Sequence, residues 1–219
     1  MHEKRIERLI SAMNSRGGDG VLVASKENRF FLSGFTGETG AVLITENSRT
    51  LFVEQRYALQ AALETKGFAI VNTGGGLYNS INDTIISEGI KHIIYEDGYF
   101  TVSEYRSLRK NLRYEELIPA GDLMLRLRAV KDGGELAVLA EAADLTDRGM
   151  GYVRSIIKTG ISERELALKA ELYLRTHGAE AMASSPVIAS GARGAMPSAA
   201  PSAKELAFGD MVVVNLGIM

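Results

Sequence analysis

The chain has 219 residues, 46% of them hydrophobic, no cysteine and a formal net charge of −2. This length allows one large domain or two smaller ones, and the apolar content is that of a globular chain that can bury a core. The small net charge gives no bias toward nucleic acid or an anionic membrane, and the lack of cysteine excludes disulfides and thiolate chemistry.

The N-terminal stretch MHEKRIERLISAM is charged and lacks the apolar centre of a signal peptide. No apolar run approaches the roughly 20 residues that span a bilayer. Together with the absence of cysteine, these features predict a cytoplasmic protein that binds neither membrane nor nucleic acid.

The first part of the chain alternates between short apolar runs and amphipathic stretches, which predicts a mixed sheet flanked by helices. Residues 28–37, NRFFLSGFTG, are interpreted as an aromatic loop closed by glycines, and 41–45 with 50–53 as a hairpin. The other strands are expected at 20–24, 69–72, 92–95 and 113–117, and the helices at 2–16, 56–66, 77–88 and 102–110.

A domain boundary is expected near Pro119-Ala120-Gly121, where the pattern turns helical. Helices are predicted at 123–130, 134–158 and 163–176, and Ser162 with Glu165 has the spacing of a capping box. Strands at 186–190 and 211–216 then enclose a long loop rich in Gly, Ala, Pro and Ser.

Three stretches stand out in chain order: NRFFLSGFTG with its hairpin, LRAVKDGGELAVLAEAADLTDRGM, and the C-terminal SSPVIASGARGAMPSAAPSAKELAFGDMVVVNLGIM. Together they resemble the creatinase/prolidase/aminopeptidase P family, the pita-bread metallopeptidases. In the last stretch the matching residues are Ile188-Ala189-Ser190-Gly191, Met196-Pro197, Pro201-Ser202, Gly209-Asp210 and Gly217. The resemblance implies an α/β chain with a creatinase-type N-terminal domain (1–120), followed by the first half of a pita-bread α+β domain (121–219).

Two positions depart from the family's pattern. Ser198 stands at the family's histidine position, and Asn215 at the position of its first metal-binding aspartate. Active relatives hold two divalent cations (manganese, cobalt or zinc), which need anionic oxygens to bridge them and offset their charge. An Asn amide is a poor substitute for a bridging carboxylate, and serine cannot exchange a proton near neutral pH as histidine can.

Spacing by itself favours a plainer interpretation, in which Asn215 satisfies backbone groups at a strand end and Ser198 is a solvated loop residue. We therefore assign no catalytic residue and no metal ligand, and expect no cofactor in this chain. None of the three histidines has the spacing of a ligand pair, and no nucleophile motif supports a Ser–His–Asp triad.

Arg29 is the one candidate for substrate binding, because the resemblance implies that the loop at 28–37 can reach the active site of a neighbouring subunit. Arg29 is expected to be exposed while Phe30 or Phe31 fills the core. Gly74-Gly75-Gly76 lies between a strand and a helix, but it lacks the spacing of a dinucleotide or Walker loop and is expected to be a flexible connection.

The sequence thus predicts a relative of Xaa-Pro metallopeptidases (aminopeptidase P or prolidase type) that is inactive on its own. Alternatives are a fragment of an active Xaa-Pro aminopeptidase or dipeptidase and, from another class, a small-molecule-binding α/β module. A peptide is a possible ligand. We also expect a homodimer, because half of a pita-bread domain leaves the sheet at 211–216 unpaired.

Overall fold

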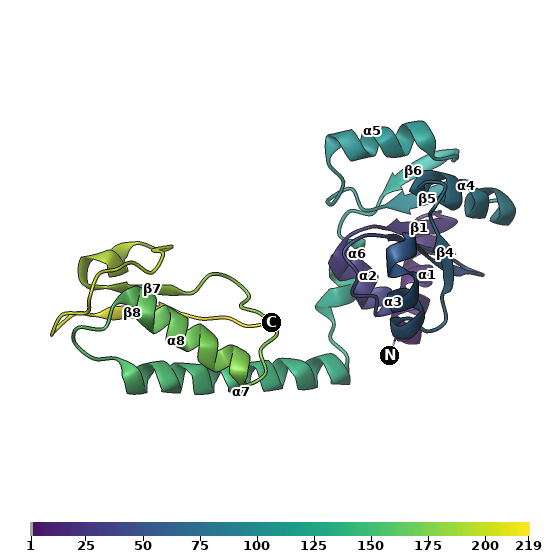
Figure 1. The fold of residues 1–219 in the computed structure, drawn as a ribbon. Coiled ribbons are helices and arrows are strands. Elements are labelled where there is room, and N and C mark those ends of the chain that lie inside the picture. The colour runs from purple at the N-terminus through teal and green to yellow at the C-terminus, as the bar shows by residue number, and fades with distance from the viewer. Residues whose placement is uncertain (1) are drawn as a thin grey trace. The chain divides into compact units, whose positions relative to one another are not determined.

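The computed structural model describes residues 2–219 and divides into two compact units, Met1–Val130 (unit 1) and Lys131–Met219 (unit 2). Figure 1 shows the helices and strands of both units. The division follows the predicted helix at 123–130 rather than preceding it. That helix, α6 (Leu123–Ala129), buries Leu123, Met124 and Leu127 in the core of unit 1.

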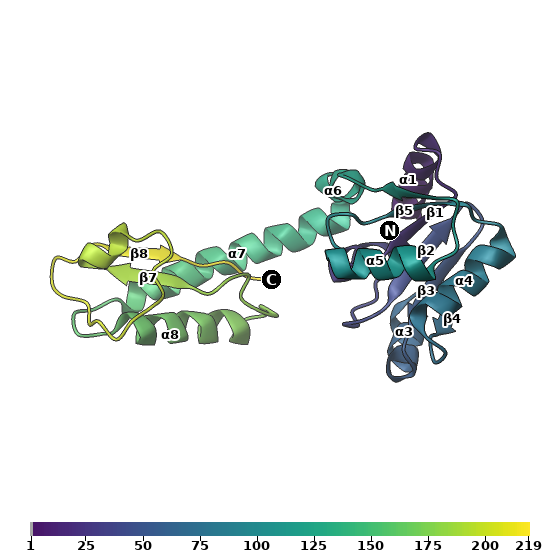
Figure 2. The ribbon, with the colours of Figure 1, turned by 90° about the horizontal axis from the view of Figure 1, so that it is seen from above.

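Unit 1 contains a mixed six-stranded sheet in the order β4-β3-β2-β1-β5-β6 (Figure 2). The pairs β1–β2 and β2–β3 are antiparallel, and β3–β4, β1–β5 and β5–β6 are parallel. The predicted mixed sheet with flanking helices is confirmed. The strands are β1 (Gly20–Val23), β2 (Ala41–Thr45), β3 (Arg49–Val53), β4 (Ala69–Asn72), β5 (His92–Tyr95) and β6 (Glu116–Pro119).

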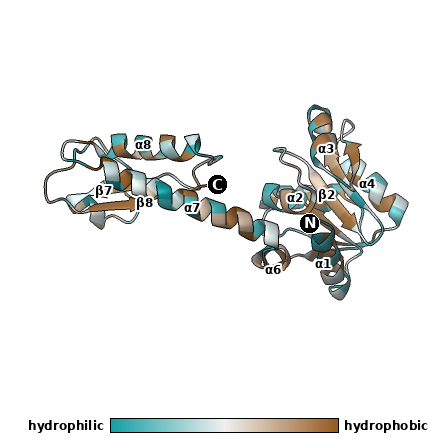
Figure 3. Ribbon diagram, turned by 90° about the horizontal axis from the view of Figure 1, so that it is seen from below, coloured by the Kyte–Doolittle hydropathy of each residue, from teal (hydrophilic) through white to brown (hydrophobic). Residues whose placement is uncertain are grey.

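Alternation along the strands divides the apolar residues between the two faces of the sheet, and both faces are covered. Val21 and Val23 face one core cluster and Leu22 faces the other. The first cluster includes residues of α1 (His2–Ser15), α2 (Lys26–Ser33), α3 (Ala58–Glu64) and α6, and the second includes α4 (Leu77–Glu88) and α5 (Val102–Asn111). A strand buried on both faces is mostly apolar, as β2 is: four apolar residues, 41–44, precede Thr45 (Figure 3).

The predicted aromatic loop at 28–37 is wrong over most of its length, because α2 occupies Lys26–Ser33. The helix ends at Gly34, whose φ of 80° places it in the left-handed region that glycine adopts without strain. Phe31 lies in the core and Phe30 is exposed, as the prediction that one of the two fills the core required.

Unit 2 packs two helices on a two-stranded antiparallel sheet. Its elements are α7 (Gly133–Ile156), α8 (Glu163–Thr176), β7 (Val187–Ser190), the 3-10 turn η2 (Gly191–Ala195) and β8 (Val212–Asn215). Val212 and Val214 face a core that includes Val153 of α7 and Leu166 of α8. The opposite face of β8 carries Val213 and Asn215, because side chains alternate along a strand.

Candidate functional site

The two positions highlighted by the family resemblance lie on connected parts of unit 2. Ser198 is exposed in a turn that the Ala199 N–H closes by donating to the carbonyl of Met196 at 3.4 Å. Asn215 ends β8, opposite Val187. η2 begins the loop that carries Ser198, and a Cβ on its Gly194 would lie 3.2 Å from Val213. Because Val213 and Asn215 share a face of β8, the loop packs on the face that carries Asn215.

The loop is organised by Glu163, a carboxylate that the sequence analysis did not select. Its side chain is fully buried at the start of α8 and accepts hydrogen bonds from three residues, Ser190, Arg193 and Ser202. The backbone N–H groups of Ser190 and Ser202 also donate to it, at 2.8 and 3.0 Å. One buried anion thus joins the end of β7 to the segment that follows Ser198.

The electrostatics of this network explain how the carboxylate stays charged. Burial by itself raises the pKa of Glu163, but the hydrogen bonds from Ser202 and Ser190 outweigh it and lower the pKa to about 2. Arg193 adds a salt bridge of 3.0 Å, and its guanidinium also donates to the carbonyl of Ala200 at 2.7 Å. Arg193 therefore spans the turn that carries Ser198.

Ser190 and Lys204 lie as close together as the two residues of a Ser–Lys nucleophile pair, but their hydrogen bonds do not suit that catalytic role. Lys204 Nζ donates to Ser190 Oγ at 2.8 Å and forms an ion pair with Asp210 at 2.6 Å. The Lys204 side chain holds the pKa of Asp210 below its usual range. Lys204 Nζ is the donor in its contacts with Ser190, Asp210 and the carbonyl of Glu205, which is the opposite of what a general base does. Ser190 is fully buried and donates to Glu163. These residues hold the loop in place.

Arg29 is buried, so the prediction that it is exposed is wrong. Only 1% of its surface is exposed, and its guanidinium donates to the carbonyls of Gly40, Gly37 and Glu38 at 2.7, 2.9 and 2.9 Å. It also lies over the ring of Phe35, at 5.9 Å from the centroid. Arg29 closes the 34–40 segment onto α2, and burial lowers its pKa. In unit 1 it serves as an internal anchor.

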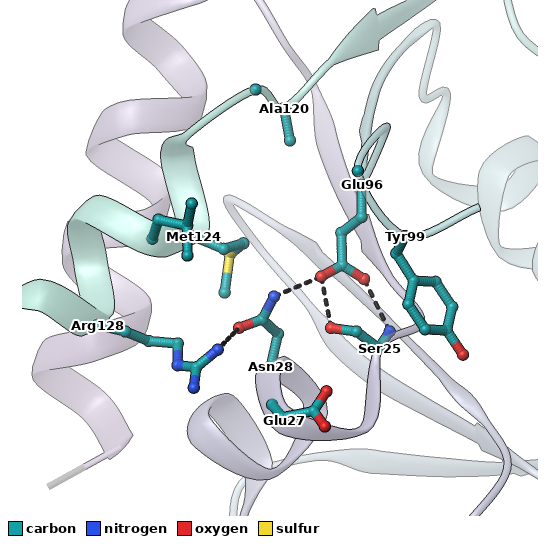
Figure 4. Close-up of a pocket in the computed structure, with 11 residues that line it drawn as sticks. Ser25, Glu27, Asn28, Glu96, Tyr99, Ala120, Met124 and Arg128 are labelled. Atoms are coloured by element: carbon teal, nitrogen blue, oxygen red, sulfur yellow. Dashed lines mark hydrogen bonds between the residues drawn. The ribbon is translucent and has the colours of Figure 1, made fainter. Parts of the chain in front are cut away.

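Unit 1 also contains a cavity of about 250 Å³. Figure 4 shows side chains of α2, of the segment after β5, and of α6 around it. Gly74-Gly75-Gly76 does not line this cavity. The cavity was not predicted, because it joins residues that are separated by about 100 positions in the sequence.

The donor set of unit 2 does not fit two divalent cations. Within residues 2–219, no three or more His, Cys, Asp or Glu side chains come together as a metal-binding group. The nearby carboxylates, Glu163 and Asp210, already accept several hydrogen bonds or an ion pair from within the unit. Asn215 and Ser198 supply only a neutral amide and a hydroxyl, which suit such ions poorly.

Comparison with known proteins identifies the family of this chain. Residues 5–130 match the Creatinase/Prolidase N-terminal domain, and residues 137–219 match Metallopeptidase family M24. The chain therefore belongs to the creatinase/prolidase family. Its fold and its sequence point to the same class of proteins, the prolidases and aminopeptidases P.

The individual relatives are consistent with this placement. The chain is 32% identical to an uncharacterized peptidase, YqhT, of Bacillus subtilis, over 97% of this chain and 60% of the relative. It is 30% identical to an Xaa-Pro dipeptidase of Pyrococcus horikoshii, covering 61% of that protein. The structure of an Xaa-Pro dipeptidase from Bacillus anthracis superposes with a TM-score of 0.94 at 31% identity, over 100% of this chain and 61% of that one. The chain thus spans about three fifths of the relatives that it matches.

Within residues 2–219, no helix combines the length and the hydropathy that crossing a bilayer requires.

Proposed function

We propose that this chain is a relative of the Xaa-Pro metallopeptidases whose own residues do not assemble a catalytic pair of metal ions. One observation carries the proposal: an amide, Asn215, and a hydroxyl, Ser198, stand where the resemblance expects an aspartate and a histidine. The Ser198 loop packs on the Asn215 face of β8, so both positions belong to one region. The chemistry available there cannot bridge two cations or exchange a proton near neutral pH.

The test is a manganese titration of the purified chain, followed by metal analysis after gel filtration and an assay with an Xaa-Pro dipeptide. We expect no stoichiometric retention of manganese and no hydrolysis. The single variant Asn215→Asp adds one carboxylate, and we expect it also to lose manganese on gel filtration, because one carboxylate is too few ligands. Two ions retained per wild-type chain, together with hydrolysis, would refute the proposal.

The alternative is that the chain is part of an active Xaa-Pro aminopeptidase or dipeptidase with two divalent cations. The share of its relatives that it spans, about three fifths, favours this candidate. In that case a longer polypeptide or a partner chain supplies the remaining ligands. Metal retention by the wild-type chain only after mixing with such a polypeptide would support this candidate.

We also propose that unit 2 pairs with a second copy of the chain. Phe208, Met211 and Val213 are exposed on and before β8, at 95%, 79% and 39%, and an apolar strand next to an open edge promotes association. Light scattering after size exclusion should give the dimer mass at micromolar concentration. A monomer at every concentration would contradict this arrangement. A cytoplasmic location and a peptide ligand remain part of the proposal.

A further inference from the structure

The cavity of unit 1 lies where open α/β sheets bind ligands. Strands β1, β5 and β6 run parallel to one another, and the cavity is lined by residues just beyond their carboxyl ends: Ser25, Glu96 and Ala120. After β1 the chain continues to β2 on one side, and after β5 it continues to β6 on the other side. The connections thus diverge between β1 and β5, which is the topological switch point at which such sheets form a crevice.

A chain of hydrogen bonds builds the wall of this cavity. The Glu96 carboxylate accepts from the backbone N–H groups of Ala24 and Ser25 at 2.6 and 2.8 Å. It also accepts from Ser25 Oγ at 2.7 Å and from Asn28 Nδ2 at 2.5 Å. With four donors around its two oxygens, Glu96 has little capacity left for a ligand. It acts as an anchor for the wall.

Asn28 connects Glu96 to Arg128 through hydrogen bonds. Its side-chain oxygen accepts a hydrogen bond of 3.2 Å from one terminal nitrogen of the Arg128 guanidinium (Figure 4). Arg128 is half-buried and forms no ion pair with a carboxylate of residues 2–219. A guanidinium has five N–H donors, so most of them are available to an anion.

A second charge of opposite sign lines the same cavity. Glu27, in the first turn of α2, is exposed, and within residues 2–219 its carboxylate makes neither a hydrogen bond nor an ion pair. The lining also includes apolar and aromatic side chains: Met124 and Leu125 from α6, and the ring of Tyr99. Drug-sized ligands occupy roughly 300–1,000 Å³, so a cavity of about 250 Å³ suits a smaller molecule.

We propose that this cavity binds a small zwitterion with an apolar side chain, either an amino acid or a dipeptide. The ligand carboxylate binds the free N–H groups of Arg128, the ammonium group binds Glu27, and the apolar side chain packs on Met124, Leu125 and Tyr99. Neither the family placement nor the proposed function assigns this site. The site is independent of whether unit 2 binds divalent cations, because all residues of the site lie in unit 1.

The test uses the full chain, with leucine and leucyl-leucine as probes and calorimetry or NMR shifts as the readout. We expect at least one probe to saturate the protein, and the probe that binds more tightly distinguishes an amino acid from a dipeptide. N-acetyl-leucine lacks the ammonium group and leucinamide lacks the carboxylate. For an amino-acid site, each should bind the wild type at least about ten-fold more weakly than leucine does.

Two variants then test which side chain binds each charged group of the ligand. Glu27→Gln should weaken leucine binding about ten-fold or more and abolish the preference for leucine over N-acetyl-leucine. Arg128→Gln, which keeps an N–H for Asn28, should abolish the preference over leucinamide. Glu7→Gln and Arg106→Gln are controls on exposed helix positions outside the cavity. The same two comparisons apply to acetylated and amidated leucyl-leucine if the dipeptide binds more tightly.

The proposal is overturned if neither zwitterion saturates the wild-type chain at millimolar concentration. It is also overturned if the blocked probes bind as tightly as the zwitterions. The probe comparison needs only the wild type, so it decides the question even if a variant fails to fold. Either outcome leaves the manganese experiment on unit 2 unaffected.

Discussion

The hydroxyl of Ser202 donates a hydrogen bond of 2.6 Å to the carboxylate of Glu163, 39 positions earlier in the chain. Ser190 donates to the same carboxylate from the end of β7. A single buried anion therefore joins a helix start, a strand end and the segment beyond Ser198. Removing the charge of Glu163 should therefore destabilise the packing of these three segments.

Glu163→Gln should lower the free energy of unfolding by about 2–4 kcal/mol at pH 7, because the amide NH₂ faces donors where the wild type has an acceptor. Urea unfolding measures the loss, and hydrogen exchange at the Ser190 and Ser202 amides locates it. Glu165→Gln is the control on the same helix turn, because its side chain is 54% exposed, and it should cost less than about 0.5 kcal/mol. Equal losses in the two variants would contradict the role of Glu163.

The pH dependence of stability follows from the same carboxylate. The pKa of Glu163 in the folded chain, about 2, lies below its ordinary value of 4.5, so the charge stabilises the fold above pH 4.5. That contribution, at most about 3 kcal/mol, is lost as the pH falls from 4.5 to 2. We expect the loss in the wild type and a flatter profile in Glu163→Gln, measured by urea unfolding across this range. Parallel profiles would refute this assignment.

The packing of α7 on α8 depends on Gly149. A Cβ at this position would lie 2.5 Å from Cδ2 and 3.1 Å from Cγ of the buried Leu174. Gly149→Ala should therefore destabilise the chain by about 1–3 kcal/mol. Gly151→Ala is the matched control on the same helix, since its added Cβ meets nothing within 4 Å beyond its chain neighbours and the nearby backbone of its own helix, and it should stabilise by about 0.5–1 kcal/mol. Urea unfolding of both variants checks the sign, and a stable Gly149→Ala would contradict the close approach.

Arg29→Met should destabilise unit 1 by about 3–5 kcal/mol, because the carbonyls of Gly37, Glu38 and Gly40 lose their donors. Arg29→Lys keeps the charge but not the planar fork, so it should recover only part of the loss. Arg56→Met, at a side chain that is 64% exposed, is the control and should change stability by less than about 0.5 kcal/mol. Thermal unfolding compares the three, and an unchanged Arg29→Met would show that the anchor is dispensable.

Glu96→Gln should raise the hydrogen-exchange rates of the Ala24 and Ser25 amides, because both donate to this carboxylate. We expect a loss of about 1–3 kcal/mol in the free energy of unfolding. Glu116→Gln, on the exposed side of β6, should leave both amides protected. Amide exchange followed by NMR separates the two, and unchanged protection in Glu96→Gln would contradict the proposed anchoring of the wall.

The sequence by itself determined the order and kind of most elements. Helices α4 and α8 and strand β5 have the bounds predicted from their periodicity, because hydrophobic spacing is a local property that burial on one face imposes. The mixed sheet followed from the alternation of strands and helices. The aromatic run of α2 was mistaken for a loop, since bounding glycines are as typical of a helix end as of a turn.

Only the tertiary structure decided which polar groups are buried and what they bind. Ser198 and Asn215 could be selected by resemblance, but nothing local distinguishes Glu163 from the solvated acids that favour helix N-termini. The sequence predicts an exposed Arg29 beside a phenylalanine that fills the core, whereas the carbonyl partners of Arg29 come within reach only when 34–40 folds back on α2. The cavity likewise depends on α6 returning to α2 across about 100 residues. Burial and hydrogen-bond partners depend on packing between residues far apart in the chain, and the local sequence pattern does not determine that packing.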